Sequence, residues 1–109
     1  MSRFRDLKWS RTEKKVARDA FDLAYERECA AIKEEASAML ASITDPSDIW
    51  RVHDFLDDRR EAVDRRYDYR YSVLPLVFGH LLRDGWLNEE DIAGLRSDKL
   101  ELVKRIAEL

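Results

Sequence analysis

The chain has 109 residues, of which 39% are charged, and its formal net charge is −3 at pH 7. A net negative charge argues against a nucleic-acid-binding module, because such a module needs a concentrated basic patch. The sequence has no apolar run as long as a membrane span and no hydrophobic stretch of a signal peptide near its start, so we expect a cytoplasmic protein without membrane insertion.

The residue types favour an all-α fold. Glu, Arg, Lys, Ala and Leu are abundant, whereas three Gly and two Pro leave little material for β-hairpins. A chain of this length is expected to form a single domain, residues 1–109. The single cysteine, Cys29, cannot form an internal disulfide, which fits a reducing cytosol. Its position on an apolar helical stripe predicts a buried, unreactive thiol.

The chain is predicted to begin with a flexible arm, residues 1–9, followed by a long helix. Ser10 and Glu13 form a capping box, and the helical pattern then continues to about Ile43. Apolar side chains recur every three or four residues along this helix: Phe21, Tyr25, Cys29, Ile32, Ala36, Met39 and Ile43. Small residues follow the other side: Ala17, Ala20, Ala24, Ala31 and Ala38. They would allow another helix to approach closely.

The length of this helix predicts that it projects from the core. At 1.5 Å per residue it would be about 50 Å long, whereas a compact monomer of this size is about 25–30 Å across. A projecting helix with an apolar stripe needs a partner, and the simplest partner is a second copy of the chain. The alternative is a helix that bends or breaks near Lys33–Ser37.

A second helix is predicted to start at a strong N-terminal signal. Asp45 is a suitable N-cap, Pro46 suits the first helical position, and Asp48 can close a capping box. This turn would fold the second helix back on the first as an αα-hairpin. The helix is expected to end near Tyr69 to Ser72, so residues 10–71 form a helical stalk.

The second helix has two faces when successive residues are placed 100° apart. Five residues form the predicted buried side: Ile49, Val52, Leu56, Val63 and Tyr67. Carboxylates dominate the opposite side, and Trp50 lies among them. An exposed tryptophan indicates a docking surface, because Trp and Arg anchor interfaces more often than other residues. The alternative is that Trp50 covers a neighbouring helix or loop.

Residues 72–109 are predicted to form a small head of three short helices. Each helix has a candidate capping residue: Ser72, Asn88 and Ser97. Gly85 and Gly94 are expected to follow the first two helices. Gly79 lies inside the first, strongly apolar helix and indicates a close contact with another helix. The inner face of the last helix is predicted to consist of Leu100, Val103 and Ile106.

No catalytic motif is visible. The sequence lacks a glycine-rich phosphate loop, a serine elbow and a Cys–His pair at a recognisable spacing. His53 and Asp57 could reach one metal ion, but no third ligand is close in sequence, so a hydrated pair is the simpler interpretation. Neither catalysis nor a cofactor is expected. A metal-dependent hydrolase that uses His53, Asp57 and Asp58 is a further hypothesis.

Several motifs resemble the fluorescence recovery protein family of cyanobacteria. The most specific is the run Asp48-Ile49-Trp50-Arg51-Val52-His53-Asp54-Phe55-Leu56, followed by Arg60, Asp64, Tyr67, Asp68, Arg70, Ser72 and Val73. The first helix contributes Trp9-Ser10, Phe21, Tyr25, Arg27 and Glu28. The resemblance covers about residues 9–105. It implies an all-helical antiparallel dimer, in which long helices form an extended stalk and short helices form the heads.

The resemblance also implies a function. Members of this family bind the photoactivated orange carotenoid protein, chiefly through its C-terminal domain, and speed its return to the inactive orange form. This ends the quenching of the phycobilisome. The family's partner-binding residues match Trp50, His53, Asp54 and Arg60 here, close to the dimer interface.

For the dimer interface itself, the expected residues are Ile49, Leu56, Ile43 and Met39. The sequence departs from the family at Leu76, where cyanobacterial members carry an aromatic residue. This departure suits a divergent homologue, and the alternative function is therefore a homologous helical scaffold dimer that binds an unrelated protein in an organism without phycobilisomes.

Overall fold

The computed structural model describes residues 7–109, which form helices joined by short connections. In chain order the elements are α1 (Arg11–Ala41), the 3-10 helix η2 (Pro46–Asp48), α2 (Ile49–Arg66), α3 (Leu74–Arg83), the 3-10 helix η3 (Glu89–Ile92) and α4 (Ser97–Ala107). This range contains no β-strand, so the predicted all-α class is confirmed. Most of the predicted flexible arm, namely residues 1–6, lies outside the described residues.

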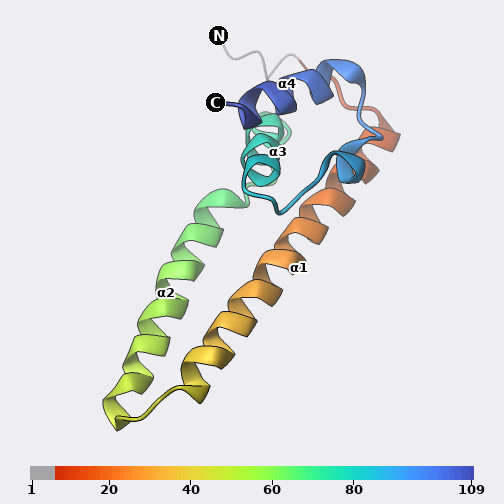
Figure 1. Cartoon of the computed structure of the whole chain (residues 1–109). Coiled ribbons are helices and arrows are strands. Elements are labelled where there is room, and N and C mark those ends of the chain that lie inside the picture. Colours follow the sequence, from red (N-terminus) through yellow and green to blue (C-terminus); the bar gives the residue numbers. More distant parts are fainter. Residues whose placement is uncertain (1–6) are drawn as a thin grey trace.

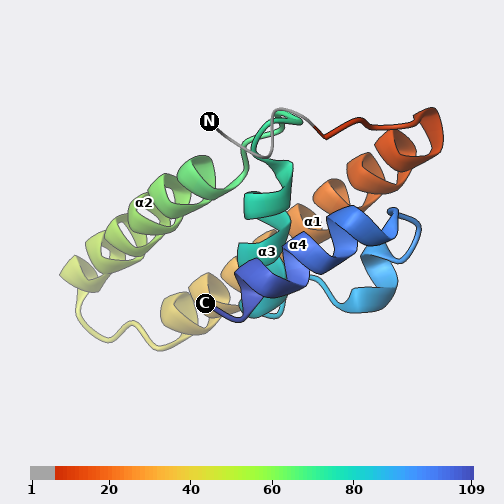
Figure 2. The same cartoon turned by 90° about the horizontal axis from the view of Figure 1, so that it is seen from above.

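α1 and α2 form a long hairpin that projects from a head made of α3, η3 and α4 (Figure 1). Seen from above, α3 and α4 lie against the N-terminal half of α1, while α2 lies to one side of the head (Figure 2). The chain is elongated, with extents of 54 × 28 × 24 Å. α1 is one uninterrupted helix, so the alternative of a break near Lys33–Ser37 is wrong.

The predicted capping boxes at the two ends of the hairpin are present. Ser10 Oγ accepts a hydrogen bond from the backbone N–H of Glu13 at 3.1 Å, and Glu13 accepts one from the N–H of Ser10 at 3.1 Å. Asp45 and Asp48 form the equivalent box around η2, which leads directly into α2. These bonds satisfy backbone N–H groups that have no partner within their own helix.

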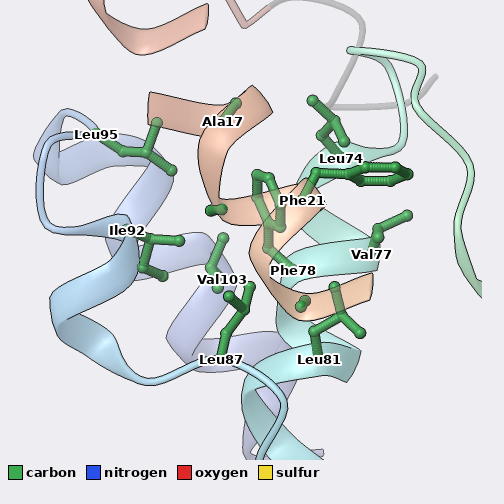
Figure 3. Close-up of a cluster of buried hydrophobic side chains, with 12 residues drawn as sticks. Ala17, Phe21, Leu74, Val77, Phe78, Leu81, Leu87, Ile92, Leu95 and Val103 are labelled. Carbon is green, nitrogen blue, oxygen red and sulfur yellow. The ribbon is translucent and has the colours of Figure 1, made fainter. Parts of the chain in front are cut away.

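The hydrophobic core lies in the head and in the part of α1 beside it (Figure 3). Its fully buried members include Leu74, Phe78, Leu81, Ile92 and Val103. The small side chains of Ala17, Ala20 and Ala24 are also buried here, so the predicted close approach occurs between α1 and the head. Gly79 makes the predicted close contact, since a Cβ at this position would lie 2.4 Å from Cγ2 of Ile106.

The predicted end of α2 is wrong by several residues, because its tyrosines leave the helix to pack on α1. α2 ends at Arg66. The rings of Tyr67 and Tyr69 then contact Phe21 edge-on, with centroid distances of 5.3 and 4.9 Å. Aromatic edge-to-face pairs of this kind add to the stabilisation from burial.

Two of the predicted helix caps in the head are also wrong. Ser72 does not cap α3, which starts at Leu74 and has Val73 as its N-cap residue. Ser97 is the first residue of α4 rather than its cap. The start of α4 is instead held by α1, because the carboxylate of Glu13 accepts a hydrogen bond from the backbone N–H of Arg96 at 3.0 Å. Gly85 follows α3 with φ +85°, as its predicted role at a helix end requires.

The predicted buried side of α2 is only partly buried. Val52 and Val63 are buried inside the hairpin, and Tyr67 is half-buried. Ile49 and Leu56, in contrast, remain 42% and 43% exposed, so for the single chain this part of the prediction is wrong. Cys29 is half-buried rather than buried, which corrects the expectation of a fully covered thiol.

Candidate functional site

The first turn of α2 presents a large aromatic side chain to the outside of the hairpin. Trp50 is 66% exposed, so the alternative that it covers a neighbouring helix or loop is wrong. α2 begins at Ile49, directly after the capping box of Asp45 and Asp48, and this fixes where along the hairpin the indole lies. An exposed tryptophan on a rigid helix can bury a large apolar area in a partner at little conformational cost.

The polar side chains next to Trp50 have weak partners within the chain. Nδ1 of His53 lies 3.4 Å from Oδ1 of Asp54, and both side chains are exposed. Among residues 7–109 Asp54 has no Lys or Arg within ion-pair distance. Arg60 pairs with Asp64 at 3.7 Å, but these side chains are 81% and 68% exposed. Exposed ion pairs contribute little to folding stability. His53, Asp54 and Arg60 can therefore give up these contacts within the chain and bind a partner instead.

The structure places three of the four predicted partner-binding residues together. Trp50, His53 and Asp54 lie within a little more than one turn of α2. Arg60 is ten residues from Trp50, about 15 Å further along the helix axis. A partner that contacts all four residues must therefore follow α2 for about three turns.

Exposed apolar side chains are present on both helices of the hairpin. Ile49 and Leu56 are exposed on α2, and Tyr25 and Leu40 on α1 are 47% and 48% exposed. A hollow of about 400 Å³ lies between the two helices, and it is lined by Tyr25, Cys29, Ile32, Leu56, Arg59, Arg60, Val63 and Asp64. Arg60 thus lies at the border between the polar surface and the apolar hollow.

The other two residues predicted for a dimer interface lie elsewhere. Met39 and Ile43 are half-buried near the turn of the hairpin. They line a separate hollow of about 180 Å³ together with Ser42, Asp48, Arg51 and Val52. Met39 and Ile43 therefore lie at the turn of the hairpin, whereas Leu56 lines the hollow further along α2.

A partly buried polar cluster where the hairpin meets the head was not predicted. Glu28 of α1 is 7% exposed and accepts hydrogen bonds from Arg66 and Tyr67 at the end of α2. Burial, together with the hydrogen bond that it donates to Glu28, raises the pKa of Tyr67 above its usual range. The partners are 38 and 39 residues apart in sequence, so no local spacing could have indicated them.

Within residues 7–109, no three His, Cys, Asp or Glu side chains are grouped so that they could hold a metal ion. None of the helices in the described part of the chain is long and apolar enough to cross a membrane.

Comparisons with known proteins match nearly the whole chain. A family model described as "Photoprotection regulator fluorescence recovery protein" matches residues 9–107. The fluorescence recovery protein of Synechocystis sp. PCC 6803 is 37% identical over 101 residues, which is 93% of each chain. The solved structure of the Synechocystis protein matches this chain with a TM-score of 0.88 and 36% identity. The solved structure of the fluorescence recovery protein from Fremyella diplosiphon matches with a TM-score of 0.87 and 40% identity. Each match covers 94% of this chain and 100% of the other.

Proposed function

Because the chain belongs to the fluorescence recovery protein family of photoprotection regulators, we propose that it is a non-enzymatic regulator of an orange carotenoid protein. It binds the photoactivated form, mainly through that protein's C-terminal domain, and accelerates the return to the inactive orange form. In this way it ends quenching of the phycobilisome.

The exposed surface around Trp50 is the observation that carries this proposal. Within residues 7–109, Trp50 contributes to no core, and Asp54 and Arg60 have only exposed or weak partners. These side chains are therefore available to a partner without loss of folding contacts. In the proposed complex Trp50 is the apolar anchor, Asp54 and Arg60 make oriented polar contacts, and His53 lies at the rim.

The proposed acceleration requires differential affinity. A protein that bound every state of its partner equally well would not shift the partner's equilibrium or its rate of conversion. The regulator must therefore bind the compact or intermediate state of the carotenoid protein more tightly than the state with separated domains. A tenfold acceleration corresponds to a difference of about 1.4 kcal/mol, which one buried aromatic anchor can supply.

We also propose that the functional unit is a homodimer. The hairpin projects from the head, and its exposed apolar residues Ile49 and Leu56 have no cover in the single chain. An antiparallel pairing of two hairpins would cover them, with Ile43 and Met39 contributing at the hairpin turn. Covering apolar surface is the main favourable contribution to association.

The test is the dark recovery rate of photoactivated orange carotenoid protein, measured with and without this protein. Trp50→Ala and Arg60→Ala are expected to abolish the acceleration while circular dichroism stays unchanged. Arg65→Ala is the matched control, because Arg65 forms a similar exposed pair with Glu61 at 3.5 Å on the same helix. Full acceleration by both Trp50→Ala and Arg60→Ala would contradict the site, and no acceleration by the unmodified dimer would contradict the partner.

A second candidate function is a helical scaffold dimer that binds an unrelated protein. Leu76 favours it, because this residue replaces the aromatic side chain expected from the family and is 38% exposed on α3. A scaffold would dimerise but would leave the recovery rate of the carotenoid protein unchanged. Acceleration by the unmodified chain would therefore rule it out.

A further inference from the structure

Three helices are joined by one polar cluster at the base of the hairpin, where the head begins. This neck cluster consists of Glu28 on α1, Arg66 and Tyr67 at the end of α2, and Asp84 at the end of α3. It lies at the opposite end of α2 from Trp50 (Figure 1). None of its members belongs to the surface proposed for partner binding.

The carboxylate of Glu28 is the centre of the neck cluster. Nη1 of Arg66 donates to its two oxygens at 2.9 and 3.0 Å, and the hydroxyl of Tyr67 donates to one of them at 3.0 Å. The other end of the Arg66 guanidinium lies 3.4 Å from Oδ2 of Asp84. Since the guanidinium is planar and holds its donors in a rigid fork, it fixes α1, α2 and α3 in one relative geometry.

Apolar packing alone holds α2 weakly. Only Val52 and Val63 of its 18 residues are buried. Its other ion pair with α1 joins Arg59 and Glu35 at 3.8 Å, and both side chains are about half exposed. Apart from the tyrosines that follow it, α2 is thus held against α1 by two buried valines and one exposed ion pair. The charged hydrogen bonds to the buried carboxylate of Glu28 therefore have a large influence on its direction.

The neck cluster controls a long lever. Trp50 is 16 residues from Arg66, which is about 24 Å along the helix axis. A rotation of α2 by about 10° at the neck would therefore move the indole by about 4 Å, more than the tolerance of a specific contact. A change at Glu28 can in this way alter a surface that Glu28 does not touch.

We propose that Glu28 is a positioning residue, which through Arg66 holds the α2 surface in the direction that the partner recognises. This inference rests on the proposed function, since it concerns the same partner-binding surface. It assigns to the neck cluster a role in presenting Trp50 and Arg60, in addition to its contribution to stability.

The direct test measures the direction of α2 without any partner. Spin labels at exposed positions Asp58 on α2 and Glu101 on α4 report the distance between hairpin and head, in a Cys29→Ser background diluted with unlabelled protein. Asp58 lies about 12 Å along the helix axis from Arg66, so Glu28→Gln is expected to shift the distance distribution by about 2 Å or to broaden it. The cause is that the Gln amide has one oxygen, where the carboxylate has two, to accept from Arg66. Glu35→Gln makes the same chemical change on the same helix and should leave the distribution unchanged.

The functional arm uses the recovery assay. Glu28→Gln is expected to reduce the acceleration about tenfold, as the loss of one anchor contact does, whereas Glu35→Gln keeps it. Arg66→Lys is a milder second variant that retains the charge but cannot reach Glu28 and Asp84 as one fork, and it should give an intermediate shift in both measurements. It keeps the test decisive if Glu28→Gln does not fold.

Two results would overturn the proposal. One is a distance distribution in Glu28→Gln and Arg66→Lys that matches the unmodified protein. The other is a shifted distribution with an unchanged acceleration. If the unmodified protein fails to accelerate recovery, the proposed function is wrong, but the distances still decide whether the neck cluster sets the direction of α2.

Discussion

Glu13 joins the start of α1 to the start of α4. Its side chain is buried and accepts hydrogen bonds from the backbone N–H groups of Ser10 and Arg96 at 3.1 and 3.0 Å. Nζ of Lys99, which is only 1% exposed, lies 3.0 Å from it, and the ring of Trp9 lies 5.1 Å from the same Nζ. The sequence identified Glu13 only as part of a capping box. In the structure it also binds the start of α4 to α1.

Glu13 gives a prediction of how stability depends on pH. Burial alone would raise its pKa, but the hydrogen bonds from Arg96, Ser10 and Lys99 outweigh burial and lower the pKa to about 2. A carboxylate with a lowered pKa in the folded state stabilises the fold above its unfolded pKa of 4.5, and this contribution is lost as the pH falls toward 2.

We therefore expect the melting temperature to fall between about pH 4.5 and pH 2, in the window set by this pKa. Glu13→Gln should be less stable at pH 7, and its melting temperature should change less across this window. The melting temperatures of both proteins are measured by calorimetry across this pH range at matched ionic strength. Parallel curves for the two proteins would show that Glu13 does not cause the pH dependence.

Several element boundaries were predicted correctly from local signals, although the predicted caps at Ser72 and Ser97 were wrong. The capping boxes at Ser10 and Asp45 and the glycine after α3 follow from residues within a few positions of one another. The end of α2 could not be predicted in this way, because Tyr67 leaves the helix for contacts with α1, far away in sequence. The neck cluster was missed for the same reason.

The packing of α3 on α4 gives a prediction at Gly79. A Cβ there would lie 2.4 Å from Cγ2 and 2.7 Å from Cβ of Ile106. Alanine gains about 1 kcal/mol of helix propensity over glycine, whereas overpacking a core costs about 1–3 kcal/mol. Gly79→Ala should therefore lower the free energy of unfolding by about 1 kcal/mol, measured by denaturant titration.

A double-mutant cycle identifies the cause of this loss. In an Ile106→Ala background the nearer of the two clashing atoms, Cγ2, is absent, so Gly79→Ala should cost less there than in the unmodified chain. If Gly79→Ala proves more stable than the unmodified protein, or if its cost is equal in both backgrounds, the contact with Ile106 is not limiting.

At the scale of the whole molecule, the elongated shape follows from the sequence. An unbroken helical pattern that is longer than the width of a compact chain must project, and the longest extent is 54 Å. The burial of α2 was not predictable to the same degree. Periodicity shows that Ile49 and Leu56 share a side with Val52 and Val63, but it cannot show that α1 covers only the latter pair. The exposed pair is what connects the shape of the chain to its assembly.

Ile49 therefore provides the test of the proposed homodimer. Ile49→Glu would place a charge in an apolar contact between two hairpins, where an unpaired carboxylate must lose its hydration. The interface of a stable dimer buries at least about 1,200 Å², and a charge at its centre should leave a monomer in light scattering coupled to size-exclusion chromatography. The folded content by circular dichroism should be unchanged, because Ile49 is 42% exposed in the single chain.

Leu76→Glu is the matched control for this experiment. Leu76 is also aliphatic and is 38% exposed, but it lies on α3 in the head rather than on the hairpin. The same change of an exposed apolar residue to glutamate should leave the dimer intact there. If Ile49→Glu stays dimeric while Leu76→Glu becomes a monomer, the copies associate through their heads. The exposed side of α2 would then be free for the carotenoid protein along its whole length.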